Sequence, residues 1–194
     1  MKLFMLLLGC RPQGRNTEQH DVFFGIGETM KDLIPDIKKS WPEAKGNIHV
    51  DAWRQINSVD GYSIHIEEVG FMQSLKDRPK KEFDLFFINL GGYKENEFDE
   101  FHYKMLVVAD NLDKAKDKAK KTAFFKHVTL PSTANNPTAT SHIDDKYGID
   151  VDDIYAVEDI LPAHLKEKFT VAITPNKPSV EDEFHLGYFK LVDL

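Results

Sequence analysis

Three Glu-x-His pairs are the residues of this sequence best suited to chemistry. They are Glu18/His20, Glu100/His102 and Glu183/His185. In an extended chain, residues i and i+2 point to the same face, about 6.5–7 Å apart along the strand. A carboxylate and an imidazole so placed can share a metal ion with ligands from elsewhere, or act as an acid–base pair. A structural alternative stays open, in which the His packs at a strand entrance and the Glu binds it or a loop N–H.

A second recurring pair is His-x-Asp, which lies at the expected start of a strand. Its two copies are His49/Asp51 and His142/Asp144. With Glu18, His20, Glu100 and His102 they form the candidate site. A divalent metal is possible but not expected, and its ligands would be Glu18, His20, Glu100 and His102. These pairs too have a structural alternative, because duplication preserves structural residues as readily as functional ones.

No established catalytic or cofactor motif accompanies these pairs. The sequence has no phosphate-binding P-loop, no GxSxG, no HExxH and no CxxC, and Gly25-x-Gly27 lacks the third glycine of a dinucleotide fingerprint. The sequence therefore assigns no cofactor and leaves open whether the protein is an enzyme.

The pairs recur because the chain repeats itself. A shift of 82 residues without a gap superposes 3–41 on 85–123 and brings Leu8-Gly9 onto Leu90-Gly91. Beyond the helix the match resumes with a shift of 93, which places 49–51 on 142–144. The difference is interpreted as an insertion, the loop PSTANNPTAT at 131–140. Such a repeat predicts the unit of folding before any element is assigned.

Each copy is expected to fold as strand, strand, helix and a further pair of strands. The apolar runs 3–8 and 85–90 are typical of buried strands, and Thr29 and Asn111 are helix N-cap residues. Pro35 predicts a kink in the first helix or a start nearer Asp32. Residues 48–56 and 62–67 flank an Asp60-Gly61 turn and predict a hairpin. The fold prediction is α+β, with two tandem ββαββ units whose helices pack on a largely antiparallel sheet.

Three segments follow from this organisation. Residues 1–82 form the first repeat unit, and 83–170 form the second with its inserted loop at 131–140. The sequence EDEFH at Glu181–His185 repeats the tetrapeptide DEFH of Asp99–His102. Residues 171–194 are nevertheless too short for a third unit, so we expect a strand segment that completes a sheet.

Composition bounds the function. A net charge of −7 and a pI near 5.6 argue against nucleic acid or an anionic membrane as partner. One cysteine, Cys10, fits a reducing compartment, and no run approaches the roughly 20 apolar residues of a membrane span. The start, MKLFMLLLGC, looks superficially like a lipoprotein signal, but its apolar core 3–8 is too short. We expect a cytoplasmic protein; a small ligand, a protein partner and a homo-oligomer all remain open.

The Leu-Gly turn, the Glu-x-His element and the segment HVDAWRQINSVDGYSI at 49–64 together resemble a bacterial family known only as domain of unknown function 1543, whose domain often occurs in tandem. The resemblance covers about 3–62, and 85–155 more loosely. The second copy departs from the first at two aligned positions, where Lys146 replaces Trp53 and Ile154 replaces Gly61. The resemblance implies no activity, substrate or catalytic residue.

Three hypotheses on function follow. The first hypothesis is a non-catalytic module that binds a small ligand or a protein partner, because catalytic motifs are absent and the architecture is duplicated. The alternative is a metal-dependent or acid–base enzyme of hydrolase type that uses the repeated Glu-x-His pairs. A purely structural role in a homo-oligomer is a third hypothesis.

Overall fold

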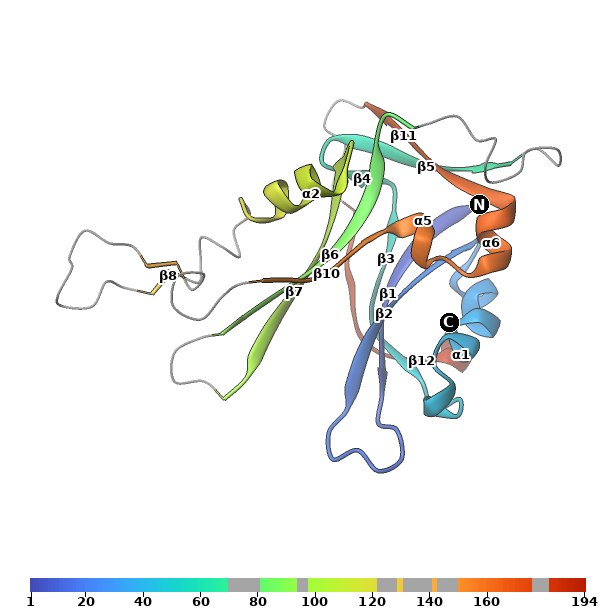
Figure 1. The fold of residues 1–194 in the computed structure, drawn as a ribbon. Coiled ribbons are helices and arrows are strands. Elements are labelled where there is room, and N and C mark those ends of the chain that lie inside the picture. Colours follow the sequence, from blue (N-terminus) through green and yellow to red (C-terminus); the bar gives the residue numbers. More distant parts are fainter. Residues whose placement is uncertain (70–80, 94–97, 122–128, 131–140, 143–149, 176–181) are drawn as a thin grey trace. The chain divides into compact units, whose positions relative to one another are not determined.

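The computed structural model shows an α+β protein built mostly from antiparallel strands, with few helices (Figure 1). The structure describes all residues except 70–80, 94–97, 122–128, 131–140, 143–149 and 176–181. The chain divides into two compact units. Unit 1 comprises Met1–Lys80 and Glu158–Leu194, and unit 2 comprises Lys81–Val157.

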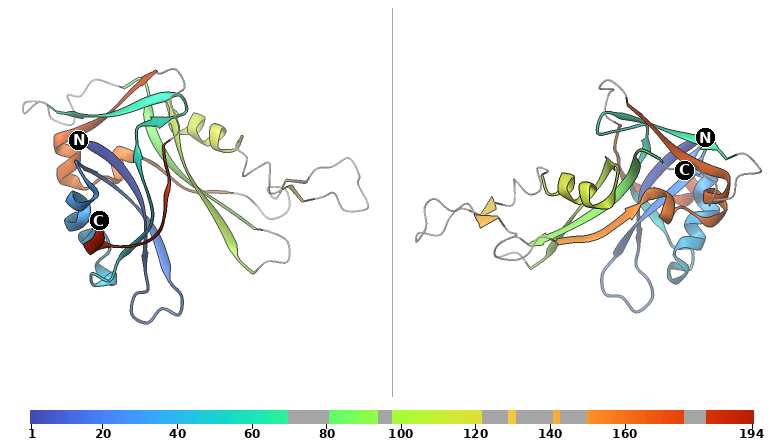
Figure 2. Two further views of the ribbon diagram at one scale, coloured as in Figure 1. Left: turned by 180° about the vertical axis from the view of Figure 1, so that it is seen from behind. Right: turned by 45° about the horizontal axis from the view of Figure 1, so that its top comes forward.

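A four-stranded antiparallel sheet forms the centre of unit 1. Its strands are β1 (Lys2–Cys10), β2 (Gln19–Gly27), β3 (His49–Ile56) and β12 (His185–Lys190), in the order β12-β3-β1-β2. β1 and β2 form a long hairpin, visible from behind in Figure 2. The C-terminal strand β12 adds to the free edge of β3, so the last strand of the chain completes a sheet, as the sequence indicates.

One face of this sheet carries the core of unit 1. Because side chains alternate along a strand, Phe4, Leu6 and Leu8 share a face. They pack with Leu33 of η1 (Met30–Leu33) and Ile37 of α1 (Ile34–Ser40).

The helical segment is divided near the proline. A 3-10 turn ends at Leu33, and Pro35 lies in the first turn of α1, where its missing N–H would have no helical partner in any case. This resolves the prediction of a kink or a late start. A second short 3-10 turn, η2 (Pro42–Ala44), follows, and η3 (Leu191–Asp193) ends the chain.

A second sheet of unit 1 has the order β11-β5-β4, from β4 (Ser58–Val59), β5 (Tyr62–Glu68) and β11 (Phe169–Pro175). Asp60 and Gly61 both have positive φ, 54° and 80°, as a tight type I′ hairpin turn requires. The turn forms where the sequence predicts it, but the predicted pairing of 48–56 with 62–67 is wrong. The turn joins β4 to β5, β5 also pairs with β11, and β3 pairs with β1 and β12. The short helices α5 (Val157–Ile160) and α6 (Ala163–Lys168) precede β11.

Unit 2 contains a three-stranded antiparallel sheet in the order β10-β6-β7. The strands are β6 (Asp84–Tyr93), β7 (Glu100–Ala109) and β10 (Asp150–Ala156), and α2 (Leu112–Ala119) packs its buried Ala115 and Ala119 on one face. The Asn111 side chain accepts a hydrogen bond from the Lys114 N–H at 2.9 Å, so the predicted N-cap is confirmed. β8 (Thr129–Leu130) and β9 (Ser141–His142) form a separate short pair.

The unit boundaries differ from the segments expected from the sequence. Residues 158–170 lie in unit 1 rather than with the second repeat, because they lead into β11, which pairs along its length with β5. The inserted loop at 131–140 lies outside the described residues.

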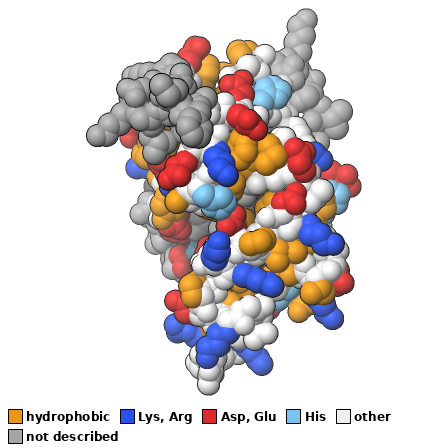
Figure 3. Space-filling model, turned by 90° about the vertical axis from the view of Figure 1, so that its right-hand side faces the viewer, with side chains coloured by type: hydrophobic (Ala, Val, Ile, Leu, Met, Phe, Trp, Pro, Cys, Tyr) orange, Lys and Arg blue, Asp and Glu red, His pale blue; other side chains and the backbone are white. Residues whose placement is uncertain are grey.

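None of the described helices is long and apolar enough to cross a membrane. On the face shown in Figure 3, acidic, basic and hydrophobic side chains are interspersed.

Candidate functional site

Four of the predicted site residues meet in unit 1. Glu18 precedes β2, His20 lies near its start, and His49 and Asp51 lie at the start of β3. Gly9 of β1 pairs with both His20 and His49, so the two imidazoles flank one backbone position. They lie on the sheet face opposite α1, because the neighbouring Leu8 faces the core.

The four side chains form a closed ring of alternating imidazoles and carboxylates. His20 Nε2 lies 3.2 Å from Asp51 Oδ2 and 3.8 Å from Glu18 Oε2. His49 Nε2 lies 3.1 Å from Glu18 Oε1 and 3.3 Å from Asp51 Oδ1. Both imidazoles use the same nitrogen, and each carboxylate contacts both of them.

Asp51 lies at a β-bulge beside this ring. Leu7 pairs with Ala52 and Leu8 with Val50, which leaves Asp51 as an extra residue without a partner on β1. Asp51 shares the face of His49 because residues i and i+2 of a strand point to the same side.

Gly9 leaves the space that the ring occupies. A Cβ added there would lie 2.3 Å from His49 Nε2 and 2.4 Å from Asp51 Oδ2. No side chain fits at that distance, so the glycine of the repeated Leu-Gly turn has a physical reason at this position.

His49 is the most buried member of the ring. The residue is 7% exposed, and its ring stacks on Tyr188 of β12 with centroids 4.3 Å apart. Its Nε2 and the Oδ2 of Asp51 are buried atoms that make no hydrogen bond, despite the short distances to the opposite charges. A buried polar atom without a hydrogen bond is costly unless another group satisfies it.

The donor types of the ring suit a transition-metal ion. The four nitrogen–oxygen distances are 3.1, 3.2, 3.3 and 3.8 Å, and each imidazole nitrogen faces a different oxygen of each carboxylate. Two imidazole nitrogens with carboxylate oxygens form a donor set typical of zinc and its neighbours in the first transition row.

Unit 2 carries a related cluster of Glu100, His102 and Asp152. His102 Nε2 lies 3.4 Å from Asp152 Oδ2 and 4.0 Å from Glu100 Oε2. One potential ligand atom from each residue lies within 4.8 Å of the others. Gly91 pairs with His102, and a Cβ on Gly91 would lie 2.3 Å from Asp152 Oδ2.

The strand register corrects the predicted alignment of the second halves. Val50 pairs with Leu8 and Val151 with Leu90, and the ladder irregularity falls at Asp51 in β3 and at Asp152 in β10. Asp51 therefore corresponds to Asp152, a shift of 101 rather than 93.

The register thereby shows that His142/Asp144 is not the counterpart of His49/Asp51. His142 lies in β9, which pairs with β8, and Asp144 lies outside the described residues. The sequence had contained the signal that finds Asp152, since the dipeptide Val-Asp occurs at 50–51 and at 151–152.

The third Glu-x-His pair has a different environment. Glu183 and His185 lie 3.9 Å apart, and the His185 ring stacks on Trp53 at 3.8 Å between centroids. Asp182 holds this segment in place, because its carboxylate accepts hydrogen bonds from the N–H groups of Asn57 and Ser58 at 2.9 and 3.2 Å. This geometry favours the structural interpretation of the pair.

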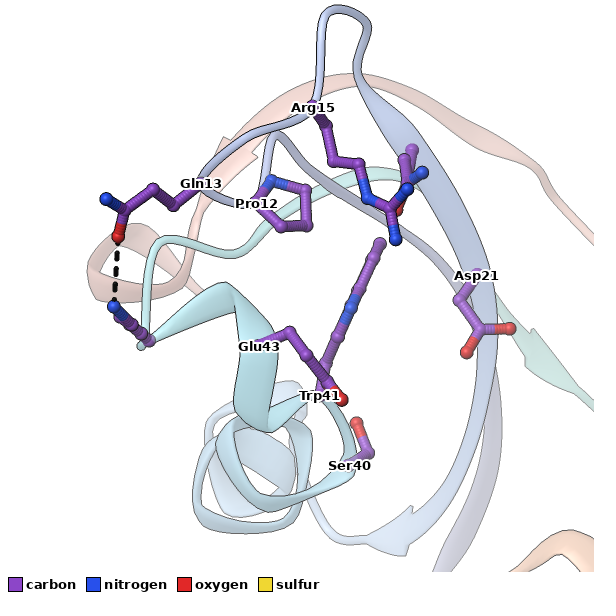
Figure 4. A pocket seen from close by; sticks show the side chains of 9 residues that line it. Pro12, Gln13, Arg15, Asp21, Ser40, Trp41 and Glu43 are labelled. Atoms are coloured by element: carbon purple, nitrogen blue, oxygen red, sulfur yellow. Dashed lines mark hydrogen bonds between the residues drawn. The ribbon is translucent and has the colours of Figure 1, made fainter.

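A pocket lies on the other face of the β1–β2 end, towards α1. Its volume is about 640 Å³, and its lining includes Trp41, the basic Arg15 and Lys45, and the acidic Asp21 and Glu43. Figure 4 shows Arg15 reaching from the hairpin loop towards Trp41, with Asp21 on β2 beside them. Lys45 Nζ donates a hydrogen bond to Gln13 Oε1 at 3.2 Å, which joins the loop after η2 to the hairpin loop (Figure 4).

A family comparison matches residues 15–66 to a family described as Domain of Unknown Function (DUF1543). The chain resembles DUF1543 over these residues. The match confirms the family resemblance seen in the sequence, and the DUF1543 segment contains all four members of the ring in unit 1.

The comparison of structures extends the likeness to the whole chain. The crystal structure of a protein Il1583 from Idiomarina loihiensis is 25% identical, with a TM-score of 0.60, and the match covers 98% of this chain and 97% of that chain. It supports the α+β fold along the full length. No curated protein matches this chain.

Proposed function

We propose that this chain is a divalent-metal-binding protein whose principal site is Glu18, His20, His49 and Asp51. The observation that carries the proposal is His49: a buried imidazole whose Nε2 makes no hydrogen bond and lies about equally far from two carboxylates.

Ion pairing alone accounts poorly for this ring. An unprotonated Nε2 presents a lone pair to the carboxylate oxygens, which repels them. A protonated Nε2 has one hydrogen and would donate it well to only one of the two oxygens. A divalent cation accepts electron pairs from both imidazoles and both carboxylates at once, and it satisfies the buried atoms.

The donor set favours an ion such as Zn²⁺ or Co²⁺ over Mg²⁺ or Ca²⁺, which prefer oxygen ligands alone.

We further propose that the chain is a tandem duplication of a ββαββ unit and resides in the cytoplasm. The shared strand order and bulge position support duplication, and the single cysteine fits a reducing compartment.

Calorimetric titration with Zn²⁺ tests this function. The wild type should bind Zn²⁺ tightly, and Asp51→Asn and His20→Ala should each weaken that binding at least about tenfold, the scale on which even supporting residues of metal sites act. His164→Ala is the matched control, because His164 Nε2 also lies 3.2 Å from a carboxylate, that of Asp36, away from the ring. Unchanged Zn²⁺ binding in both ring variants, or none in the wild type, contradicts the proposal.

A second candidate function is binding of a small organic ligand in the pocket of Trp41 and Arg15. Its volume of about 640 Å³ lies within the usual range for ligand sites. Arg15 and Lys45 suit a carboxylate, Asp21 and Glu43 suit an ammonium group, and the indole offers a stacking surface. Together these side chains favour a zwitterion such as a free amino acid.

This second candidate is tested by adding each of a panel of L-amino acids to the protein and measuring its tryptophan fluorescence. At least one amino acid should give a saturable change in fluorescence that Arg15→Ala abolishes. If no amino acid gives a saturable change, the candidate is contradicted.

A further inference from the structure

We infer that unit 2 holds a second, separate metal site, formed by Glu100, His102 and Asp152, and that it selects a harder ion, with Mn²⁺ as the representative, than the site of unit 1. The inference rests on the proposed metal-binding function of unit 1, because the cluster of unit 2 has the same arrangement of strands, glycine and bulged aspartate.

The two sites have the same strand pairing, the same bulge position and a glycine at the same place. Gly91 pairs with His102 as Gly9 pairs with His20. Asp152 occupies the bulge of β10 as Asp51 occupies that of β3. The missing Cβ of Gly91 leaves room for the Asp152 carboxylate, as that of Gly9 does for the ring of unit 1.

The residue that differs is the buried imidazole. His49 pairs with Gly9, and the position that pairs with Gly91 is occupied by Asp150. The second site therefore offers one imidazole where the first offers two. Carboxylate oxygens suit manganese, magnesium and calcium, whereas imidazoles favour zinc and copper, so this exchange shifts selectivity towards harder ions.

The cluster of unit 2 is open to solvent. The side chains of His102, Glu100 and Asp152 are 37%, 41% and 30% exposed, about as much as their counterparts His20, Glu18 and Asp51 at 43%, 46% and 26%. The described residues of unit 2 place no counterpart of the buried His49, whose side chain is 9% exposed, beside them. Hard ions with six or more ligands retain water molecules, and an exposed three-residue site leaves space for them. Asn89, two residues before Gly91 and so on the same face of β6, contributes a buried Oδ1 that makes no hydrogen bond, an oxygen that a bound ion or its water could satisfy.

The test measures Mn²⁺ binding by the loss of the free-ion EPR signal, using the full chain preloaded with one equivalent of Zn²⁺. One further equivalent of Mn²⁺ should bind to the wild type. His102→Ala and Asp152→Asn should each weaken Mn²⁺ binding at least about tenfold while Zn²⁺ binding persists. Glu183→Gln, in the third Glu-x-His pair, is the matched control and should bind Mn²⁺ as the wild type does.

The Asp51→Asn variant separates the two proposals. When titrated with Zn²⁺, it should lose the zinc site of unit 1. When titrated with Mn²⁺ in the absence of Zn²⁺, it should keep the Mn²⁺ site of unit 2. The inference is overturned if Zn²⁺-loaded wild type binds no Mn²⁺, or if His102→Ala and Asp152→Asn bind it unchanged. Wild-type Zn²⁺ affinity in both Asp51→Asn and His20→Ala overturns the proposed function of unit 1 instead, and the Mn²⁺ results with the unit 2 variants still decide the second site.

Discussion

One glycine and one bulged aspartate define each cluster at the scale of single residues. The acid and the imidazole of a Glu-x-His pair approach a third partner only where the intervening strand carries no side chain. Gly9 and Gly91 provide that space at equivalent positions, which explains why Leu-Gly recurs with the pairs.

Gly9→Ala should therefore damage the site directly. The added methyl group would lie 2.3 Å from His49 Nε2, so the imidazole must move, and we expect at least about a tenfold loss of Zn²⁺ affinity. Overpacking of this kind also costs about 1–3 kcal/mol of stability. Calorimetry and urea unfolding measure the two effects. Gly46→Ala is the control: Gly46 has a φ of +81° but open space around it, so that variant should lose stability and keep its Zn²⁺ affinity.

Cys10, the last residue of β1, should react slowly. Burial raises the pKa of its thiol, and the negative charge of Glu18 raises it further, while the residue is 1% exposed. Since the thiolate is the nucleophile, native protein at pH 7.5 should label with iodoacetamide much more slowly than protein in urea. Glu18→Gln removes the smaller cause of the raised pKa and should leave the native rate slow. Equal rates in native and unfolded protein would contradict the buried position of this thiol.

At the scale of elements, the turn before α1 depends on one carboxylate. Asp32 accepts hydrogen bonds from the Thr29 N–H at 2.8 Å and the Thr29 hydroxyl at 3.1 Å. These bonds, that from the backbone first, lower the pKa of Asp32 below its ordinary value. A lowered folded-state pKa means that the stabilisation is present above the unfolded pKa of about 3.9 and is lost as the pH falls through the folded value.

Asp32→Ala should consequently be less stable than the wild type at pH 7, and the difference should shrink as the pH falls below about 4. Urea unfolding of both proteins between pH 7 and pH 2.5 provides the comparison. A difference that stays constant across this range would show that the carboxylate charge is not the stabilising feature.

The elements also show how far the sequence could be interpreted unaided. Strand identity, the Asn111 cap and the Asp60-Gly61 turn follow from local patterns, since side-chain alternation and capping are local properties. The register of β10 is not local. It depends on pairing with β6 and on a bulge that adds one residue, so the His142/Asp144 alignment, made from sequence spacing alone, missed Asp152.

The difference between local patterns and long-range pairing also explains which residues of the unit 1 site the sequence predicts. The sequence predicts Glu18, His20, His49 and Asp51 because they stand in recurring pairs, and the structure brings them together. Tyr188 was not predicted, because it reaches His49 only after the C-terminal strand has added to β3, a contact between distant parts of the chain.

At the scale of the whole molecule, metal binding should be linked to stability. An ion bound only by the folded protein, at 100 times its dissociation constant, adds about 2.7 kcal/mol. For a chain of this size that corresponds to a rise in Tm of about 5–10 °C. Calorimetric melts with Zn²⁺ should show this rise in the wild type and in His164→Ala but little of it in Asp51→Asn. An equal rise in all three proteins would assign the effect to binding elsewhere.

The most direct test of the metal site in unit 1 is anomalous diffraction at the zinc edge from crystals grown with Zn²⁺. We expect a peak inside the ring of unit 1, about 2.0–2.1 Å from the Nε2 atoms of both His20 and His49, with carboxylate oxygens of Glu18 and Asp51 completing the coordination. A zinc-saturated crystal without a peak between these two nitrogens would contradict it, and the ring would then be a purely structural junction of β1, β2 and β3.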